Sequence, residues 1–148
     1  MEAGEALEAR QMAGFKDFYQ YAWATRVVVG KGLIDGVGFE FAKEGAQRVY
    51  IVTDQAIRGT GLVDRVEAGL AGGGLEVAGV FDDVPQDSAL DTVERCAEAA
   101  KAAGADSFLA VGGGSVMDTA KIANAVFSYG GSAREYEGIY TLPRANDG

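Results

Sequence analysis

Short apolar runs alternate with segments of helical periodicity along most of this 148-residue chain, and no other feature limits its fold as strongly. The runs predict strands at residues 25–32, 48–54, 75–84 and 106–114, and the periodic segments predict helices at residues 33–47, 61–74, 87–105 and 115–128. Regular alternation of strands and helices is typical of a parallel sheet with right-handed crossovers. Because the runs are continuously apolar, we expect an α/β fold with flanking helices on both faces of the sheet.

Three of the predicted helices carry a clear apolar face, which should pack on the sheet. These faces are Leu33, Ile34, Val37 and Phe41 in the first helix, Leu62, Val63, Val66 and Leu70 in the second, and Val93, Cys96, Ala97 and Ala100 in the third. Gly45 predicts the end of the first helix, and Ser88 with Asp91 predicts the N-cap of the third.

The chain length fits one domain. Residues 1–14 are rich in Ala and Glu and carry no helix cap, so we predict a flexible N-terminal extension there. Residues 15–148 form the predicted domain, and from Gly130 onward they show no regular periodicity.

The net charge of −9 limits the partners of the chain. Nucleic acids are bound largely through Lys and Arg contacts to phosphates, so we expect no nucleic-acid partner. An anionic membrane surface is disfavoured in the same way, and no apolar run approaches the roughly 18 residues of a membrane span. A single cysteine permits no internal disulfide, and the acidic N-terminus is unlike a secretory signal, so we expect a cytoplasmic protein.

The chain contains no histidine, which is the usual general base and the commonest metal ligand. Zinc and iron sites normally include nitrogen or sulfur ligands, so we predict neither a catalytic residue nor a metal ligand within this chain. Cys96 lacks a histidine to activate it and is interpreted as a small buried helix residue.

The stretch LAVGGGSVMDTAKIANAV places Gly112, Gly113 and Gly114 between a predicted strand and a predicted helix. In open α/β sheets, ligands bind beyond the carboxyl ends of the strands. The first N–H groups of a helix lack partners and attract anions, and glycines let phosphate oxygens approach the backbone. We therefore predict a pyrophosphate cradle here, with the Ser115 hydroxyl as an additional donor.

Part of this motif has a simpler interpretation. Ser115 and Asp118 also match a capping box, and Asp118 with Lys121 matches a surface ion pair at helical spacing. A cap does not require three glycines, which favours phosphate binding. The Gly-Lys-Ser/Thr order of a P-loop is absent.

Asp54 follows a predicted strand and lies 22 residues after Gly32, near the spacing of an acidic residue that binds a ribose. The same position suits a helix N-cap, and the two interpretations carry equal weight. The upstream stretch GKGLIDG matches the GxGxxG pattern poorly, and a plain turn is favoured there.

The motif GGGSVMDTAK resembles the GGGSxxDxAK signature of the iron-containing alcohol dehydrogenase family. Further stretches are similar to that family, namely VVVGKGLIDGVG, VYIVTDQAIRGTGLVDRV, FDDVPQDSALDTVERCAEAAKAAGAD and REYEGIYTLPR. The resemblance implies a Rossmann-like nucleotide-binding domain that stops before the family's helical domain, where an aspartate and histidines hold the metal. The sequence PQD at residues 85–87 departs from the family's usual PNP, so cofactor contacts by Gln86 carry little weight.

The resemblance also implies a function. Members transfer hydride between a small alcohol or aldehyde and NAD, with NADP as the alternative, while Fe²⁺ or Zn²⁺ holds the alkoxide in the full-length enzyme. By motif position, Gly113, Gly114 and Ser115 would hold the pyrophosphate, Asp118 would lie on the nicotinamide side, and Asp54 would contact the adenosine ribose and favour NAD. The resemblance further implies a homo-oligomer and an inactive chain when this domain stands alone.

Two other hypotheses stay open from the sequence. The domain could belong to a dehydroquinate synthase-like lyase or a glycerol dehydrogenase-type enzyme, although GGGS followed by DTAK favours the alcohol dehydrogenases. Alternatively, the chain could be a standalone nucleotide-binding module, which predicts a stable, monodisperse protein of this length.

Overall fold

The computed structural model describes residues 26–87 and 89–136. Its centre is a parallel sheet of β1 (Arg48–Val52), β2 (Glu76–Phe81) and β3 (Ser107–Ala110), in the order β2-β1-β3. The predicted α/β fold with a parallel sheet is confirmed. The predicted extension at residues 1–14 and the predicted cap residue Ser88 lie outside the described residues.

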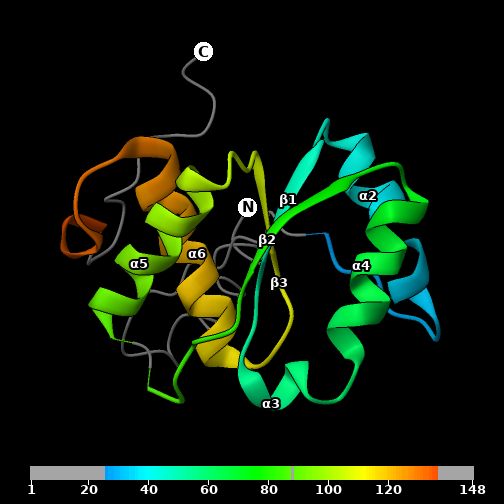
Figure 1. Ribbon diagram of the computed structural model, residues 1–148, viewed down its shortest axis with the longest axis horizontal. Helices are drawn as coiled ribbons and strands as arrows, with labels where there is room; N and C mark the ends of the chain where they lie inside the picture. The colour runs from blue at the N-terminus through cyan, green and yellow to red at the C-terminus, as the bar shows by residue number, and fades with distance from the viewer. Residues whose placement is uncertain (1–25, 88, 137–148) are drawn as a thin grey trace, which may run out of the picture.

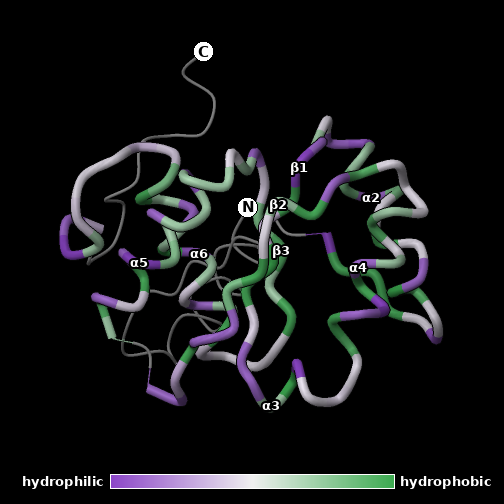
Figure 2. The backbone as a smooth tube through the Cα atoms, in the orientation of Figure 1, coloured by the Kyte–Doolittle hydropathy of each residue, from purple (hydrophilic) through white to green (hydrophobic). Residues whose placement is uncertain are grey.

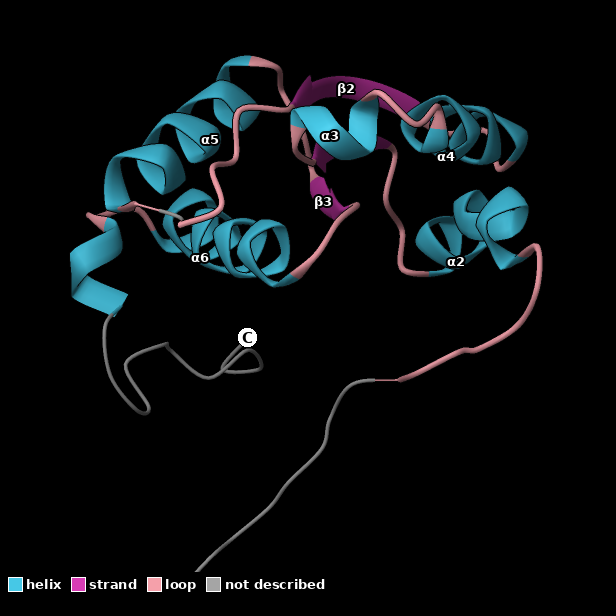
Figure 3. Ribbon diagram, turned by 90° about the horizontal axis from the view of Figure 1, so that it is seen from below, coloured by secondary structure: helices cyan, strands magenta, loops and turns pink. Residues whose placement is uncertain are grey.

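Two layers of helices enclose the sheet (Figures 1 and 3). The pair α2 (Val37–Lys43) and α4 (Leu62–Gly72) lies on one side, and the pair α5 (Leu90–Ala102) and α6 (Gly114–Tyr129) lies on the other. Three short elements complete the described fold: the 3-10 helix η1 (Leu33–Gly36), the helix α3 (Gln55–Arg58) and the 3-10 helix η2 (Ala133–Tyr136). Within the described ranges, no helix has the length and apolar character needed to cross a membrane.

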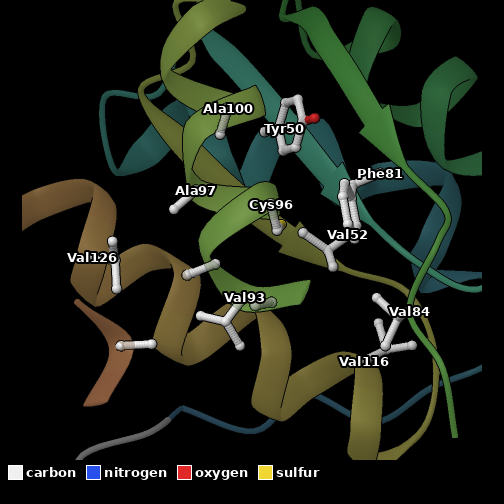
Figure 4. Close-up of a cluster of buried hydrophobic side chains, with 13 residues drawn as sticks. Tyr50, Val52, Phe81, Val84, Val93, Cys96, Ala97, Ala100, Val116 and Val126 are labelled. Atoms are coloured by element: carbon white, nitrogen blue, oxygen red, sulfur yellow. The ribbon is translucent and has the colours of Figure 1, made fainter. Parts of the chain in front are cut away.

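The central strand β1 contributes to two separate hydrophobic clusters. Tyr50 and Val52 pack with residues of α5 and α6, including Cys96 (Figure 4), whereas Val49 and Ile51 pack with residues of α4. Successive side chains of a strand point to opposite faces, so a strand covered on both faces reads as a continuous apolar run. Figure 2 shows the resulting hydrophobic stretches along the strands. The prediction of helices on both faces is confirmed.

Hydrogen bonds fix the amino ends of the strands. The Arg48 side chain pairs with Glu76 at 2.6 Å and donates from Nε to the carbonyl oxygen of Gly104 at 2.8 Å. The Asp106 carboxylate accepts hydrogen bonds from the backbone N–H groups of Gln47 and Arg48. Burial raises the pKa of the Asp106 carboxyl, but its hydrogen bonds and the nearby Arg48 charge together lower it by more, so its pKa lies below the ordinary value. These contacts fix the amino ends of the strands, and the loops at their carboxyl ends are available for a site.

The strand predicted at residues 25–32 is wrong for the part that the structure describes. Residues 26–30 form no strand, and a turn follows at Lys31 and Gly32. Val27, Val28 and Val29 are exposed, because no neighbouring strand pairs with them among the described residues. A β-branched run favours a strand only when it finds a ladder partner and a surface to pack on.

The predicted helices are otherwise close to those observed. The segment predicted as one helix at residues 33–47 divides into η1 and α2, and Leu33 is exposed rather than buried. Gly45 has a φ of 84°, and the Ala46 N–H donates to the carbonyl oxygen of Phe41, so a left-handed glycine follows α2 as predicted. The sequence did not predict α3 or η2, which are each only four residues long.

Candidate functional site

A cleft of about 470 Å³ lies at the carboxyl ends of the three strands. It is lined by residues 54–56 after β1, residues 82–86 after β2, and residues 113–116 after β3. Each strand therefore contributes one wall, as the rule for open α/β sheets requires. Asp54, Gly113, Gly114 and Ser115 are predicted site residues that the fold brings together in this cleft.

The wall after β3 presents backbone N–H groups that have no partner among the described residues. The first helical hydrogen bond of α6 runs from the Met117 N–H to the carbonyl oxygen of Gly113, at 3.0 Å. No described residue accepts a hydrogen bond from the N–H of Gly113, Gly114 or Ser115. Gly113 and Gly114 are exposed. The start of α6 thus offers donors and positive partial charge to an anion.

The glycines of this loop differ in what would surround a side chain. A Cβ added at Gly112 would lie 2.7 Å from Cγ2 of Val116, so packing inside the protein explains this glycine. A Cβ added at Gly113 or Gly114 would meet no atom of residues 26–87 or 89–136 within 4 Å. Gly113 has a φ of −85°, which any residue adopts, so backbone conformation does not require glycine there either. The open space over Gly113 and Gly114 is where a bound group could approach the backbone.

Ser115 occupies this wall in a different role from the predicted one. Its hydroxyl donates a hydrogen bond to the backbone carbonyl oxygen of Gln86, on the loop between β2 and α5. No side-chain cap bond is formed at the start of α6, whose N-cap is Gly113. The capping-box interpretation of Ser115 and Asp118 is therefore wrong, and the hydroxyl joins two walls of the cleft.

Asp54 is the N-cap of α3, and its Oδ1 accepts a hydrogen bond from the Ile57 N–H at 2.8 Å. The N-cap interpretation of this residue is confirmed. Its second carboxylate oxygen has no hydrogen-bond partner among the described residues, and Asp54 lines the cleft. A ribose hydroxyl could donate to that oxygen while the cap is retained.

Two further aspartates line the cleft, and each is paired with an arginine. Asp82 lies 2.6 Å from Nη1 of Arg58, and Asp83 lies 2.8 Å from Nη1 of Arg95. The hydrogen bond from Arg95 to Asp83 raises the pKa of the Arg95 guanidinium. With Asp54, the described lining carries three carboxylates and no Lys or Arg side chain.

Gly112 and Asp118 are predicted site residues that do not line the cleft. Asp118 is exposed on α6 and pairs with Lys121 at 3.5 Å, which confirms the predicted surface ion pair. Conversely, the loop from Asp82 to Gln86 lines the cleft, although the sequence did not predict a site residue in it. The sequence signal for this loop is its position directly after an apolar strand. The carboxyl ends of all parallel strands lie on the same side of the sheet, where ligands bind.

The described residues contain no group of three or more His, Cys, Asp or Glu side chains that could hold a metal ion. Cys96 is buried between α5 and the sheet, and burial raises the pKa of its thiol to about 12. A thiol in that state is a poor nucleophile, in agreement with its interpretation as a core residue.

Comparison with known proteins links this cleft to a family. The model of the family described as iron-containing alcohol dehydrogenase matches residues 24–147. The NAD-dependent methanol dehydrogenase of Bacillus methanolicus is 32% identical over 117 residues, which cover 79% of this chain and 30% of that relative.

Solved structures show the same similarity. NADH-dependent butanol dehydrogenase A from Thermotoga maritima matches with a TM-score of 0.72 and 30% identity, over 80% of this chain and 30% of that one. Sulfoacetaldehyde reductase from Bifidobacterium kashiwanohense, solved in complex with NAD⁺, matches with a TM-score of 0.74 and 25% identity, over 86% of this chain and 33% of that one. The chain spans about a third of the length of the relatives that it matches.

Proposed function

Since this chain belongs to the iron-containing alcohol dehydrogenase family, we propose that it forms the NAD-binding part of an oxidoreductase acting on alcohols and aldehydes. The strongest support is the pair Gly113 and Gly114, whose exposed backbone and open Cβ space leave room for a diphosphate at the start of α6. Bound NAD supplies the carbon that accepts or donates hydride.

The residues of the cleft would bind and orient the dinucleotide. The N–H groups of Gly113, Gly114 and Ser115 would donate to the diphosphate oxygens, which bear the negative charge that a helix start favours. The second carboxylate oxygen of Asp54 would accept from a hydroxyl of the adenosine ribose. A carboxylate at that position disfavours the 2′-phosphate of NADP, so NAD is the proposed cofactor and NADP the alternative.

The finer features of the enzyme are proposals drawn from its family. We propose a small alcohol or aldehyde as substrate, Fe²⁺ or Zn²⁺ in the full-length enzyme, a cytoplasmic location and a homo-oligomer. The names of the methanol and butanol dehydrogenases support the substrate class. The described residues offer no cluster of His, Cys, Asp or Glu ligands for such an ion. Asp118 is proposed to lie towards the nicotinamide and Gly112 to support the cradle through Val116.

Gly113→Ala tests the cradle. The added methyl group meets no atom in the part of the chain that the structure describes, so we expect the free energy of unfolding to stay unchanged or rise by about 0.4–1 kcal/mol. The same methyl group would fill the space of the diphosphate, and overpacking of this kind should weaken NAD binding by about tenfold or more. Titration of NADH fluorescence measures the binding, and thermal unfolding measures the stability.

Gly72→Ala is the matched control, because Gly72 also has open Cβ space and an ordinary φ but lies on α4, away from the cleft. It should bind NAD like the wild-type chain. Failure of the wild-type chain to bind at millimolar NAD, or equal binding by Gly113→Ala, would contradict the proposed cradle. Alcohol oxidation by this chain alone would contradict its proposed role as only the cofactor-binding part.

A further inference from the structure

Resting on the proposed binding of NAD, we propose that the ion pair between Arg58 and Asp82 is a second determinant of cofactor choice. Asp82 neutralises an arginine that lies beside the ribose end of the cleft and that would otherwise bind a 2′-phosphate. We call the part of the cleft at Asp54 and Asp82, with Arg58 beside it, the ribose corner. Freeing this arginine, together with removing the Asp54 carboxylate, should turn this corner into a site for NADP.

The three side chains come from segments that the fold holds together. Arg58 lies one helical turn after Asp54 on α3, and its N–H donates to the carbonyl oxygen of Asp54 at 2.9 Å. An isolated antiparallel bridge joins Asp54 to Asp83, the residue next to Asp82. Asp54 and Asp82 both line the cleft. A phosphate on the ribose that contacts Asp54 would therefore lie near Asp82 and its partner Arg58.

The charges at this corner exclude a phosphate in the present state. No described Lys or Arg side chain lines the cleft, and Arg58 directs Nη1 to Asp82 Oδ2 at 2.6 Å. A 2′-phosphate carries a charge of about −1.5 to −2 near neutral pH and would face two carboxylates without a free cation. Guanidinium groups bind phosphate well, so the pairing rather than the lack of an arginine prevents the interaction.

The pair can be opened without disturbing the core. The side chains of Arg58 and Asp82 are 49% and 32% exposed, and ion pairs at such positions contribute little to folding stability. Asp54 is needed as an N-cap, but serine is an equally good N-cap residue. Asp54→Ser and Asp82→Asn therefore change the charge of the corner while preserving its structure.

The experiment compares NAD⁺ and NADP⁺ binding to the whole 148-residue chain and its variants. We expect Asp54→Ser alone and Asp82→Asn alone to improve NADP⁺ binding only slightly, because each leaves one carboxylate in place. For Asp54→Ser with Asp82→Asn, we expect the ratio of the NADP⁺ to the NAD⁺ dissociation constant to fall by at least about tenfold beyond the product of the two single effects. A tenfold change corresponds to the free energy of one charge-assisted hydrogen bond. Adding Arg58→Ala should abolish that gain.

The second ion pair of the same loop provides the matched control. Asp83 pairs with Arg95, but Arg95 lies on α5 with its guanidinium over the Phe81 ring, 5.8 Å from the ring centroid. Asp54→Ser with Asp83→Asn should therefore give no gain in NADP⁺ binding beyond Asp54→Ser alone. Thermal unfolding of every variant verifies that the fold is retained.

The outcomes separate this inference from the proposed function. If the wild-type chain binds NAD⁺ and the double variant gains nothing over Asp54→Ser, the role of Arg58 is overturned while the proposed function stands. Retention of the gain after Arg58→Ala, or an equal gain in the Asp83→Asn control, overturns it as well. If the wild-type chain binds no NAD⁺, both fall together.

Discussion

At the scale of single residues, neighbouring glycines serve different purposes. Gly112 is required because a side chain would collide with Val116, whereas Gly113 and Gly114 face open space and ordinary backbone angles. The first is explained by packing inside the protein, and the other two leave open space for the proposed diphosphate. A sequence motif therefore mixes residues that support the fold with residues that serve binding, and only the surroundings of each Cβ distinguish them.

Cys96 provides a prediction at the same scale. Its thiol is buried and its pKa is raised to about 12, so the native protein should react with thiol reagents far more slowly than the denatured chain. Because the neutral thiol is favoured in the folded state, this contribution to stability is present below the unfolded value of 9.0 and is lost as the pH rises towards 12.

Unfolding of the wild-type chain and of Cys96→Ala at several pH values measures the effect. The wild-type chain is expected to be more stable at neutral pH, because alanine leaves a small cavity, and its advantage is expected to shrink above pH 9. A constant difference across the alkaline range, or rapid labelling of the native thiol, would contradict this assignment.

At the scale of elements, the cleft depends on contacts between loops that follow different strands. Val84, on the loop after β2, and Val116, in the first turn of α6, are buried in one cluster (Figure 4). The Ser115 hydroxyl donates a hydrogen bond to the Gln86 carbonyl oxygen on the same loop as Val84. Thr53 adds a hydrogen bond from its hydroxyl to the carbonyl oxygen of Val111 at 2.7 Å. The relative position of the walls is thus set before any ligand binds, which reduces the entropy lost on binding.

Ser115→Ala tests the link between two of these walls. Loss of one hydrogen bond, worth about 1 kcal/mol net, should speed amide hydrogen exchange at Val84, Gln86 and Asp87 by about fivefold in the ligand-free protein. Gln86→Ala is the control, because it keeps the accepting backbone carbonyl, and Ser115→Thr should restore slow exchange. Unchanged exchange in Ser115→Ala without ligand would show that the hydroxyl does not hold the loop.

The elements also show what periodicity in a sequence can and cannot predict. The apolar faces of α4 and α5 were predictable because Val66, Leu70, Val93 and Cys96 recur at helical spacing and are all buried. The strand predicted over Val27–Val29 was not correct, because pairing depends on partners far away in the chain. The glycine wall of the cleft was predictable from its local motif, whereas the Arg58–Asp82 pair joins two segments 24 residues apart and carries no local signal.

At the scale of the whole molecule, the described sheet has an open edge. The strand β3 pairs only with β1 among the described residues, and Val29 is 90% exposed on the segment that precedes η1. Exposed strand edges and apolar patches promote association between copies of a chain. These features support the proposed homo-oligomer over a monodisperse, standalone nucleotide-binding module.

Val29→Lys tests this expectation. Light scattering after size exclusion should show the wild-type chain associating as its concentration rises, and the variant should shift towards the monomer because a charge opposes association at an apolar patch. The melting temperature of the isolated monomer should stay the same, because the Val29 side chain is largely exposed and contributes little buried apolar area to folding stability. A wild-type chain that stays monomeric at every concentration would instead favour the standalone module.

The donors at the start of α6 belong to the main chain, and this has a consequence for how the site can change in evolution. Every residue except proline carries a peptide N–H, so no ordinary substitution in this loop can delete a donor. The proposed binding of the diphosphate would be lost here by adding bulk rather than by removing a functional group. Substitutions within this loop that spare the two open glycines should therefore leave its proposed contribution to diphosphate binding nearly constant while the rest of the loop sequence diverges.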